Sequence, residues 1–255
     1  MKDEETKVIV LYIEGIKRGK DFVELARKIT KIKPVVILKA GRTAAGVSAA
    51  HSHTAALAGD YASQEAIFKQ FGFTVANDIS ELLYYAKMFV SEKMPQGNRV
   101  AIITNGGGAG VLTTDAIASS GVLQLAELSP KTVAGIKKTM PPLVNSRNPL
   151  DLAGDADGAR YTLALNMLND DQNIDMFIVI ALFQTPGADS ALAAKLVDFK
   201  DKTDKPVIAI SIGAEYTEMH KIMMESAGLP VYDSPAAAAL SLSGLYKYAQ
   251  YRKRK

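Results

Sequence analysis

Short apolar runs alternate with longer amphipathic stretches along the chain. Near the beginning, Val8–Tyr12 and Pro34–Lys39 are rich in Val and Ile and predict buried strands, and Asp21–Thr30 between them predicts an amphipathic helix. A strand, a helix and a strand at this spacing favour parallel strands joined by a right-handed crossover. The pattern continues with a helix, a short strand and another helix, at Tyr61–Gln70, Phe73–Ala76 and Ile79–Val90.

A polar stretch that contains Pro and Gly, Ser91–Asn98, separates this first unit from a second series of strands and helices. The predicted strands of the second series are Val100–Thr104, Leu123–Leu128, Met176–Leu182, Val207–Ile212 and Pro230–Tyr232. Helices are predicted up to Ser119 and at Pro130–Thr139, Ala159–Leu168, Asp189–Lys200, Glu215–Ala227 and Ala236–Gln250. This alternation is typical of doubly wound, flavodoxin-like domains. We therefore expect an α/β fold with two parallel-sheet domains, at residues 1–93 and 97–255.

The stretch Gly41–Gly59, GRTAAGVSAAHSHTAALAG, contains two of the three histidines of the chain and is otherwise made mostly of small residues. Small residues cover little core surface, so the stretch predicts a loop that a ligand can approach closely. Ser52, His53 and Thr54 are the candidate reactive residues within it. An imidazole, with an ordinary pKa of about 6.5, is a usable nucleophile at neutral pH and can carry a phosphoryl group.

A carboxylate is expected beside this histidine. Glu14 follows the first predicted strand, and the stretch from Arg42 to His53 follows the second. The carboxyl ends of parallel strands meet at one edge of the sheet, where ligands of such sheets bind. A carboxylate that accepts from one imidazole nitrogen leaves the other nitrogen free to attack. Lys39 and Arg42 flank the loop as phosphate-neutralising groups or as solvated strand-end charges, and we favour Arg42 as a phosphate ligand.

A second candidate phosphate site follows the strand Val100–Thr104. The loop Asn105–Gly110 reads NGGGAG and leads into a predicted helix. Glycines after a strand let backbone N–H groups point at a phosphate, and the helix N-terminus adds partial positive charge. The spacing matches neither a Walker loop nor a dinucleotide-binding fingerprint, so a purely structural turn is the alternative. Asp151, in NPLDL, either faces this site or serves as a turn or capping residue.

Composition and charge exclude several classes of function. The net charge of +3 is too small to indicate nucleic-acid binding, and the basic run Tyr251–Lys255 predicts a solvated tail. No apolar run approaches the roughly 20 residues of a membrane span, and the charged start MKDEETK does not resemble a signal peptide. The lack of cysteine excludes disulfides and thiolate metal sites. We therefore expect a cytoplasmic protein that binds neither nucleic acid nor membrane.

The segments LKAGRTAAG and SHTAALAG, with TNGGGAGVL and NPLDL further on, resemble the NDP-forming acyl-CoA synthetases. These enzymes are the ADP-forming acetyl-CoA synthetase branch of the succinyl-CoA synthetase superfamily. The resemblance covers nearly the whole chain and implies that His53 is phosphorylated, supported by Glu14 of YIEG. It implies phosphate contacts from Ser52, Thr54, Asn105, Gly106, Gly107, Gly108, Ala109 and Gly110, in addition to Arg42, which is favoured above for its charge. His51 and Ala55 depart from the family, which has a small residue and a Gly at these places.

The resemblance also implies a reaction and partners. Family members interconvert acyl-CoA, ADP and phosphate with the free acid, CoA and ATP, with Mg, through an acyl phosphate and a phosphohistidine. It implies an alpha subunit in part: the second half of a phosphohistidine domain, so that the first flavodoxin-like domain is incomplete, followed by a ligase domain. A CoA-binding domain or upstream fragment and an ATP-grasp subunit or domain are expected as partners, in an oligomer. We expect no complete turnover without them.

Three other interpretations compete with this one. His51 and His53 could chelate a metal, but two ligands without cysteine leave a site unfilled, so no metal site is expected. The chain could be a non-catalytic regulatory module that keeps the ligase fold, although Glu14 and His53 argue against it. It could also be a flavodoxin-like nucleotide binder.

We expect the third histidine, His220, on the surface, with Met219, Ile222 and Met223 facing the core.

Overall fold

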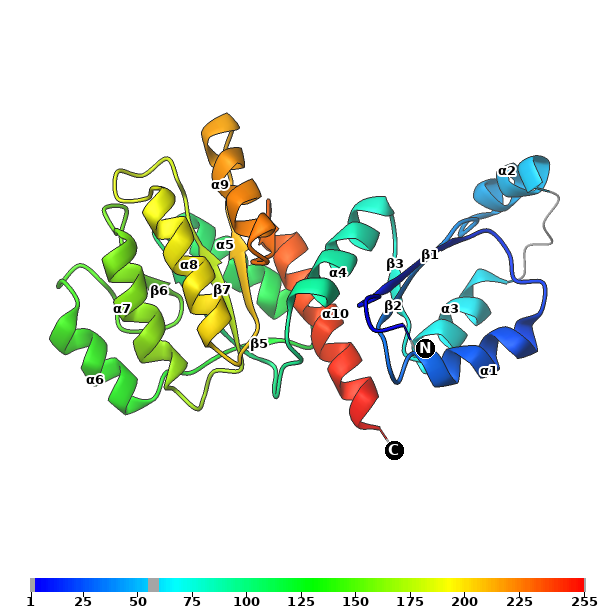
Figure 1. Cartoon of the computed structure of the whole chain (residues 1–255), viewed down its shortest axis with the longest axis horizontal. Helices are drawn as coiled ribbons and strands as arrows, with labels where there is room; N and C mark the ends of the chain where they lie inside the picture. Colours follow the sequence, from blue (N-terminus) through cyan, green and yellow to red (C-terminus); the bar gives the residue numbers. More distant parts are fainter. Residues whose placement is uncertain (1–2, 55–59, 255) are drawn as a thin grey trace. The chain divides into compact units, whose positions relative to one another are not determined.

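The structure of the chain is a computed structural model that describes residues 3–54 and 60–254 and, for side chains, residues 3–49 and 60–254. The chain divides into two compact units (Figure 1). Unit 1 comprises Met1–Val90 together with Lys247–Lys255, and unit 2 comprises Ser91–Tyr246. No helix in the described ranges combines the length and the apolar composition that crossing a bilayer requires.

Unit 1 is built on parallel strands that alternate with helices. Its strands pair in the order β1-β2-β3, with bounds Ile9–Ile13, Val35–Lys39 and Thr74–Ala76. Its helices are α1 (Gly19–Ile29), α2 (Ala44–Thr54), α3 (Tyr61–Gln70) and α4 (Ile79–Ser91). The register pairs Ile13 with Lys39 and Leu38 with Ala76, so the three strands end at one edge. This is the parallel βαβ arrangement that the apolar pattern predicted.

An aromatic layer joins α1 and α3 to one face of this sheet, and α4 lies across the sheet from them (Figure 1). Phe22 of α1 stacks on Phe73 with 5.5 Å between ring centroids and meets Phe68 of α3 edge-on at 6.1 Å. Strand residues alternate between the two faces, so Val10 and Tyr12 of β1 point away from this layer. They are 42% and 59% exposed, and β1 pairs only with β2 among the described strands. The β1 edge of this sheet is therefore free and has apolar side chains beside it, while β3 forms the opposite edge and likewise pairs only with β2 among the described strands.

The prediction of a loop after β2 is partly wrong, because Ala44–Thr54 form the helix α2. Gly41 turns the chain with a φ of +73°, a conformation that costs glycine little. Thr43 then caps the helix, as its Oγ1 accepts a hydrogen bond of 3.1 Å from the backbone N–H of Gly46. Alanine has the highest helix propensity, so an alanine-rich stretch becomes helical although its described residues bury little surface.

Unit 2 contains a parallel sheet in the order β5-β4-β7-β8-β9, with β6 pairing to β4. The strands β4 to β9 are Arg99–Thr104, Gln124–Leu125, Leu150–Asp151, Met176–Ile180, Val207–Ile210 and Val231–Tyr232. The helices α5 to α10 are Gly107–Ser119, Pro130–Thr139, Gly158–Asn169, Ser190–Lys202, Glu215–Ser226 and Pro235–Lys253. The expected α/β class with parallel strands is therefore confirmed in both units.

Helices cover both faces of the unit 2 sheet. Helices α6, α7 and α8 lie side by side on one face (Figure 1), where Ile136, Leu165 and Leu192 pack with strand residues such as Ile103. Strand β5 lies on the opposite side of β4 from β7, so a right-handed crossover places α5 on the other face. A parallel sheet with both faces covered buries its central strands completely, as β7 and β8 show.

The orientation of α9 reverses the expectation from the sequence. His220 is buried, its ring stacks on Phe183 with 4.1 Å between centroids, and its Nδ1 lies 2.8 Å from the carbonyl oxygen of Tyr216. The three residues expected in the core are instead exposed: Met219, Ile222 and Met223. The Nε2 atom of the ring lies 3.3 Å from Ser190 Oγ, so the imidazole can be buried against Phe183 with a partner for each ring nitrogen.

The C-terminal segment is anchored on unit 1, which corrects the expected solvated tail. Tyr251 OH lies 3.1 Å from Thr30 Oγ1, and Lys31 Nζ donates to the Tyr251 carbonyl at 3.1 Å. The Lys31 ammonium also lies 4.5 Å from the centre of the Tyr251 ring. The side chains that follow, Arg252 to Arg254, are exposed as predicted.

Glu92 is a buried carboxyl group at the start of unit 2. Its Oε2 accepts a 2.9 Å hydrogen bond from the backbone N–H of Val207, while its Oε1 has no partner in the described part of the chain. Burial raises the pKa of Glu92 from 4.5 to about 8, partly offset by the Val207 N–H and by Lys200. The folded chain therefore holds a proton on Glu92 that the unfolded chain releases near its ordinary pKa.

We expect this carboxyl group to make unit 2 less stable as the pH rises. The folded state binds the proton of Glu92 more tightly than the unfolded state does. The contribution of this proton to the free energy of unfolding is fully present below the unfolded pKa, and it is lost as the pH rises to about 8. The Glu92→Gln variant keeps an acceptor for Val207 N–H and has no charge to bury. Calorimetric unfolding from about pH 5 to pH 9 should show a smaller fall in midpoint for Glu92→Gln than for wild type. Glu215→Gln, at an exposed position, is the control, and parallel curves for Glu92→Gln and wild type would contradict the assignment.

Candidate functional site

Glu14 and Lys39 lie together at the carboxyl edge of the unit 1 sheet. Glu14 directly follows β1, whose last residue, Ile13, pairs with Lys39 at the end of β2. The Lys39 side chain is 2% exposed, and its Nζ donates to the carbonyl oxygen of Ala40. Burial lowers the pKa of the Lys39 ammonium, and the nearby Glu14 carboxylate partly offsets this effect. Two groups of opposite charge therefore lie near each other at this edge, and Lys39, which the sequence offered as a phosphate-neutralising or solvated charge, is instead buried.

Arg42 is placed at the same edge by the turn after β2. Its Nη1 donates to the carbonyl oxygen of Asn77 at 3.2 Å, and its guanidinium lies 5.2 Å from the centre of the Tyr61 ring. The Tyr61 hydroxyl is buried and has no hydrogen-bond partner among the described residues. A hollow of about 620 Å³ opens here, lined by Arg42, Lys39, Tyr12 and the start of α4. This edge of unit 1 therefore presents the exposed Arg42 guanidinium to an open space whose lining also includes the buried Lys39 and the acidic Asp78.

The reactive triplet falls on the last turn of α2. Ser52, His53 and Thr54 belong to the helix Ala44–Thr54, which begins a few residues after the end of β2. The side chains of these three residues and of His51 lie outside the described part, so their pairing with Glu14 remains a prediction. The chain path nevertheless carries α2 out from the edge at which Glu14, Lys39 and Arg42 gather.

Asn105 at the end of β4 joins two loops of unit 2 with its side chain. Its Nδ2 donates to the carbonyl oxygen of Leu182 at 3.1 Å and to Thr185 Oγ1 at 2.8 Å, and its Oδ1 accepts from Leu182 N–H at 2.9 Å. The residue is 2% exposed. Its amide is fully engaged within the protein, so a phosphate contact in this loop can come only from the backbone.

The glycines that follow form the N-terminus of α5. Gly106 is the N-cap residue, and the N–H groups of Gly107, Gly108 and Ala109 have no partner among the described residues. A Cβ on Gly106 would lie 2.4 Å from a Leu182 methyl, whereas a Cβ on Gly108 would meet nothing within 4 Å. The loop is therefore tightly packed on its Gly106 side and open at Gly108, where unpaired donors and the helix dipole favour an anion.

The Asp151 carboxylate lies beside this helix start. A Cβ on Gly107 would come within 2.8 Å of Asp151 Oδ2, and Asp151 Oδ1 accepts from the N–H of Ala153 at 2.9 Å. Ala153 takes a φ of +68°, which costs a non-glycine residue about 1 kcal/mol or more. Both alternatives from the sequence apply, since Asp151 stabilises a turn and also faces the glycine loop.

One polar residue that the sequence did not single out organises this part of the sheet. Asn148 precedes Pro149, and its side chain reaches between two strands. Its Oδ1 accepts from Ile102 N–H at 2.9 Å, while its Nδ2 donates to the carbonyl oxygens of Val100 and Ala126 at 2.8 and 2.9 Å. Asn148 thus replaces ladder hydrogen bonds beside β4, where the predicted strand Leu123–Leu128 shortens to Gln124–Leu125. The NPLDL motif was the available signal.

Two protein families match consecutive parts of the chain. Residues 1–89 match the succinyl-CoA ligase like flavodoxin domain, and residues 100–253 match the Ligase-CoA domain. The acetate–CoA ligase [ADP-forming] II subunit alpha of Pyrococcus furiosus is 42% identical over 94% of this chain and 53% of its own length. The acetate–CoA ligase [ADP-forming] of Methanocaldococcus jannaschii is 36% identical over 98% of this chain and 36% of its own length.

A solved structure gives the same result in three dimensions. The acetyl-coenzyme A synthetase 1 of Ca. Korarchaeum cryptofilum, in complex with phosphate and ADP, aligns with a TM-score of 0.89 and 32% identity. The alignment covers 98% of this chain and 55% of that protein. The chain thus spans about half the length of the subunit alpha relative and of this structure. From its two domain matches and these relatives, the chain belongs to the Ligase-CoA family, within the ADP-forming acyl-CoA synthetases that the sequence motifs resemble.

Proposed function

We propose that this chain is the phosphohistidine-carrying part of an ADP-forming acyl-CoA synthetase. The observation that carries the proposal is the 42% identity over nearly the whole chain with a subunit alpha named as an ADP-forming acetate–CoA ligase. The convergence of Glu14, Lys39 and Arg42 at the sheet edge from which α2 departs supports it. The reaction converts acyl-CoA, ADP and phosphate to the free acid, CoA and ATP, with Mg bound to the nucleotide.

The proposed sequence has three steps. A phosphate oxygen attacks the thioester carbonyl, the C–S bond breaks, and acyl phosphate and CoA thiol form. The imidazole of His53 then attacks phosphorus, the P–O bond to the acyl oxygen breaks, and the free carboxylate leaves. A terminal phosphate oxygen of ADP finally attacks phosphorus, the P–N bond breaks, and ATP leaves with His53 restored. The histidine splits one difficult transfer into two easier displacements.

The unit 1 residues have distinct roles in this proposal. Glu14 accepts a hydrogen bond from one imidazole nitrogen of His53, which orients the other nitrogen and stabilises the positive charge on the phosphorylated ring. Arg42, exposed and held by the Asn77 carbonyl, neutralises the phosphoryl oxygens, with Ser52 and Thr54 as hydroxyl donors. Lys39 is buried and holds positive charge beside Glu14.

The start of α5 is the proposed second place for the phosphoryl group. Its unpaired N–H groups at Gly107, Gly108 and Ala109 suit an anion, and Gly108 leaves the approach open. Asn105 serves by holding the loop against Leu182 and Thr185 rather than by touching phosphate with its side chain. Gly106 and Gly110 let the backbone pack closely against Leu182 and Thr104.

We propose further that the free edge of β1 is completed by a strand from the rest of the protein. Apart from one additional helix, unit 1 follows the order of the last part of unit 2, because β1-α1-β2-α2-α3-β3-α4 parallels β7-α8-β8-α9-β9-α10 with α2 and α3 in the place of α9. In unit 2 the other side of β7 pairs with β4. The corresponding side of β1 is open, with Val10 and Tyr12 exposed beside it. A partner that carries this strand, together with CoA-binding and ATP-grasp parts, fits the greater length of the relatives.

The central test is phosphoryl transfer. We expect the chain, combined with the CoA-binding and ATP-grasp parts and γ-labelled ATP, to gain an acid-labile, base-stable label that His53→Ala removes. Glu14→Gln should lower the labelling rate by about 10- to 100-fold without abolishing it, because the nucleophile remains while its orientation is lost. His220→Ala is a matched control at a buried histidine of unit 2. Label that remains on the His53→Ala variant, whether it is stable in acid or in base, would contradict the assignment of this residue.

The glycine loop gives a separate test. We expect Gly108→Val to reduce inorganic phosphate binding about 10-fold or more, measured by calorimetry, because its side chain occupies the open approach to the helix start. Its thermal unfolding should match wild type, since nothing lies within 4 Å of the added Cβ. Gly107→Val is the contrasting variant, because its Cβ would collide with Asp151 and destabilise the loop itself. If Gly108→Val binds phosphate as tightly as wild type does, the loop is a structural turn and not a phosphate site.

The free edge of β1 predicts a stable contact between this strand, which carries Tyr12, and the missing strand. We expect Tyr12→Glu to weaken co-purification with the segment that carries the missing strand, because a charge placed at the pairing edge must be desolvated. Tyr216→Glu, at a similarly exposed tyrosine of unit 2, should have no effect. Hydrogen exchange of β1 should slow when the segment is added. Equal exchange of β1 with and without the segment would show that another surface makes the contact.

A further inference from the structure

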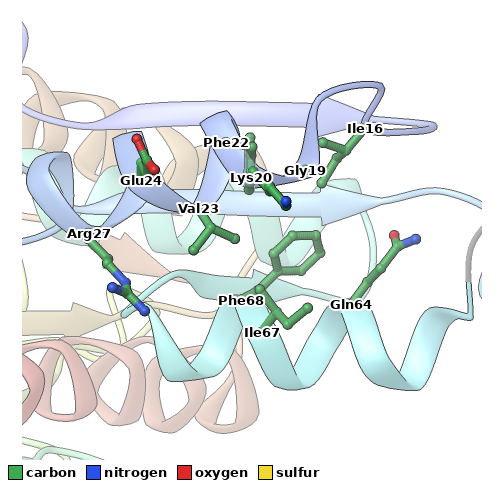
Figure 2. A pocket seen from close by; sticks show the side chains of 10 residues that line it. All are labelled: Ile16, Gly19, Lys20, Phe22, Val23, Glu24, Arg27, Gln64, Ile67 and Phe68. Carbon is green, nitrogen blue, oxygen red and sulfur yellow. The ribbon is translucent and has the colours of Figure 1, made fainter.

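A groove runs between α1 and α3 of unit 1 (Figure 2). Its volume is about 500 Å³, and its apolar lining comes from Ile16, Phe22, Val23, Ile67 and Phe68. Phe68 points from α3 toward α1, and Val23 points from α1 toward α3 (Figure 2). None of the residues proposed to act in phosphoryl transfer lines this groove. The groove is therefore a second candidate site with its own chemistry.

Gln64 supplies an unsatisfied acceptor in the groove wall. Its Oε1 is buried and accepts no hydrogen bond from any described residue. Gln64 lies toward the N-terminal end of α3 and lines the groove (Figure 2). A buried carbonyl oxygen without a donor costs about 1–3 kcal/mol, so a ligand that brings an N–H or O–H group would recover that cost. The groove thus selects for a donor at one end.

Cationic side chains border the same groove. Arg27 extends from α1 toward α3 and Lys20 lines the groove from α1, while the Glu24 carboxylate points away from α3 (Figure 2). Arg27 is held in place over the Phe71 ring, with 4.9 Å between its guanidinium carbon and the ring centre. The charge that faces the groove is therefore positive, which favours an anionic group on the ligand.

We propose that the groove between α1 and α3 binds a planar, apolar anion that carries one N–H or O–H donor. The slot between Phe68 and the α1 side chains accepts a flat ring system, Gln64 Oε1 accepts from its donor, and Lys20 or Arg27 pairs with its negative group. A volume of about 500 Å³ suits a ligand of two or three rings. This inference is independent of the proposed phosphoryl transfer, because the two sites share no residue.

A pair of fluorescent probes tests the donor. 2-Anilinonaphthalene-6-sulfonate has a flat ring system, an N–H group and a sulfonate, and its N-methyl derivative lacks only the N–H. We expect the full chain to bind the N–H probe about 5- to 10-fold more tightly, the value of one hydrogen bond. Gln64→Met should remove this ratio while keeping binding of both probes. Gln70→Met, at an exposed glutamine of α3 that does not line the groove, should keep the ratio.

The cations are tested in the same titration. Lys20→Gln and Arg27→Gln should each weaken binding of both probes several-fold and reduce its salt dependence. Lys28→Gln, at an exposed lysine of α1 outside the groove, should not. Equal affinity for the two probes in wild type would overturn the proposal, as would a ratio that persists in Gln64→Met. An equal loss in Lys28→Gln and Lys20→Gln would show general charge attraction and would likewise overturn it.

Discussion

Parallel strand pairing is the constraint on which the rest of this protein depends. Each parallel strand needs a crossover through a helix, so all strands of a sheet end at one edge and all helices begin there. In unit 1 this brings Glu14, which follows β1, next to Lys39 at the end of β2 and Arg42 in the turn after it. In unit 2 it brings the α5 N-terminus next to Asp151 and to the loop that Asn105 holds. The candidate chemistry of both units is thus a consequence of one hydrogen-bonding pattern.

The two units use that pattern to different extents. Unit 2 buries its central strands between helices on both faces, and Asn148 satisfies backbone groups where a ladder is interrupted. Unit 1 has the order of elements of one half of unit 2, apart from a second helix between β2 and β3, but leaves β1 with an open side. A parallel sheet is normally covered, so an open side with exposed Val10 and Tyr12 favours association. The relatives, about twice as long, are consistent with such a partner.

Buried polar groups mark the places where stability and recognition compete. One carboxyl oxygen of Glu92 accepts a hydrogen bond from the Val207 N–H, and the other has no partner among the described residues. The pKa of this buried carboxyl group is raised to about 8. Lys39 keeps an ammonium at 2% exposure with a carbonyl and a neighbouring carboxylate as compensation. Gln64 leaves an acceptor unpaired in a groove wall. Such groups cost stability unless a proton or a ligand satisfies them.

Local signals in the sequence were sufficient for much of the fold. The apolar runs at β1, β2, β4, β7 and β8 and the amphipathic stretches between them predicted parallel α/β units, because strand and helix periods depend on neighbouring residues alone. Motifs around His53 and Asn105 were sufficient for the family, since the comparisons confirm it. The small residues after β2 predicted a loop, but Ala44–Thr54 form a helix because alanine has a high helix propensity.

Only the tertiary structure decided which side of each element is buried and which polar group is already satisfied. His220 is buried and Met219 is exposed because α9 turns toward the core the face that carries His220, where Phe183 stacks on it. Hydrophobic periodicity alone could not identify that face. The Asn105 amide is taken by Leu182 and Thr185, which are far away in sequence. The groove at Gln64 exists only because α1 and α3 pack on one face of a sheet. Contacts between residues distant in the chain carry no local pattern, so packing alone determined them.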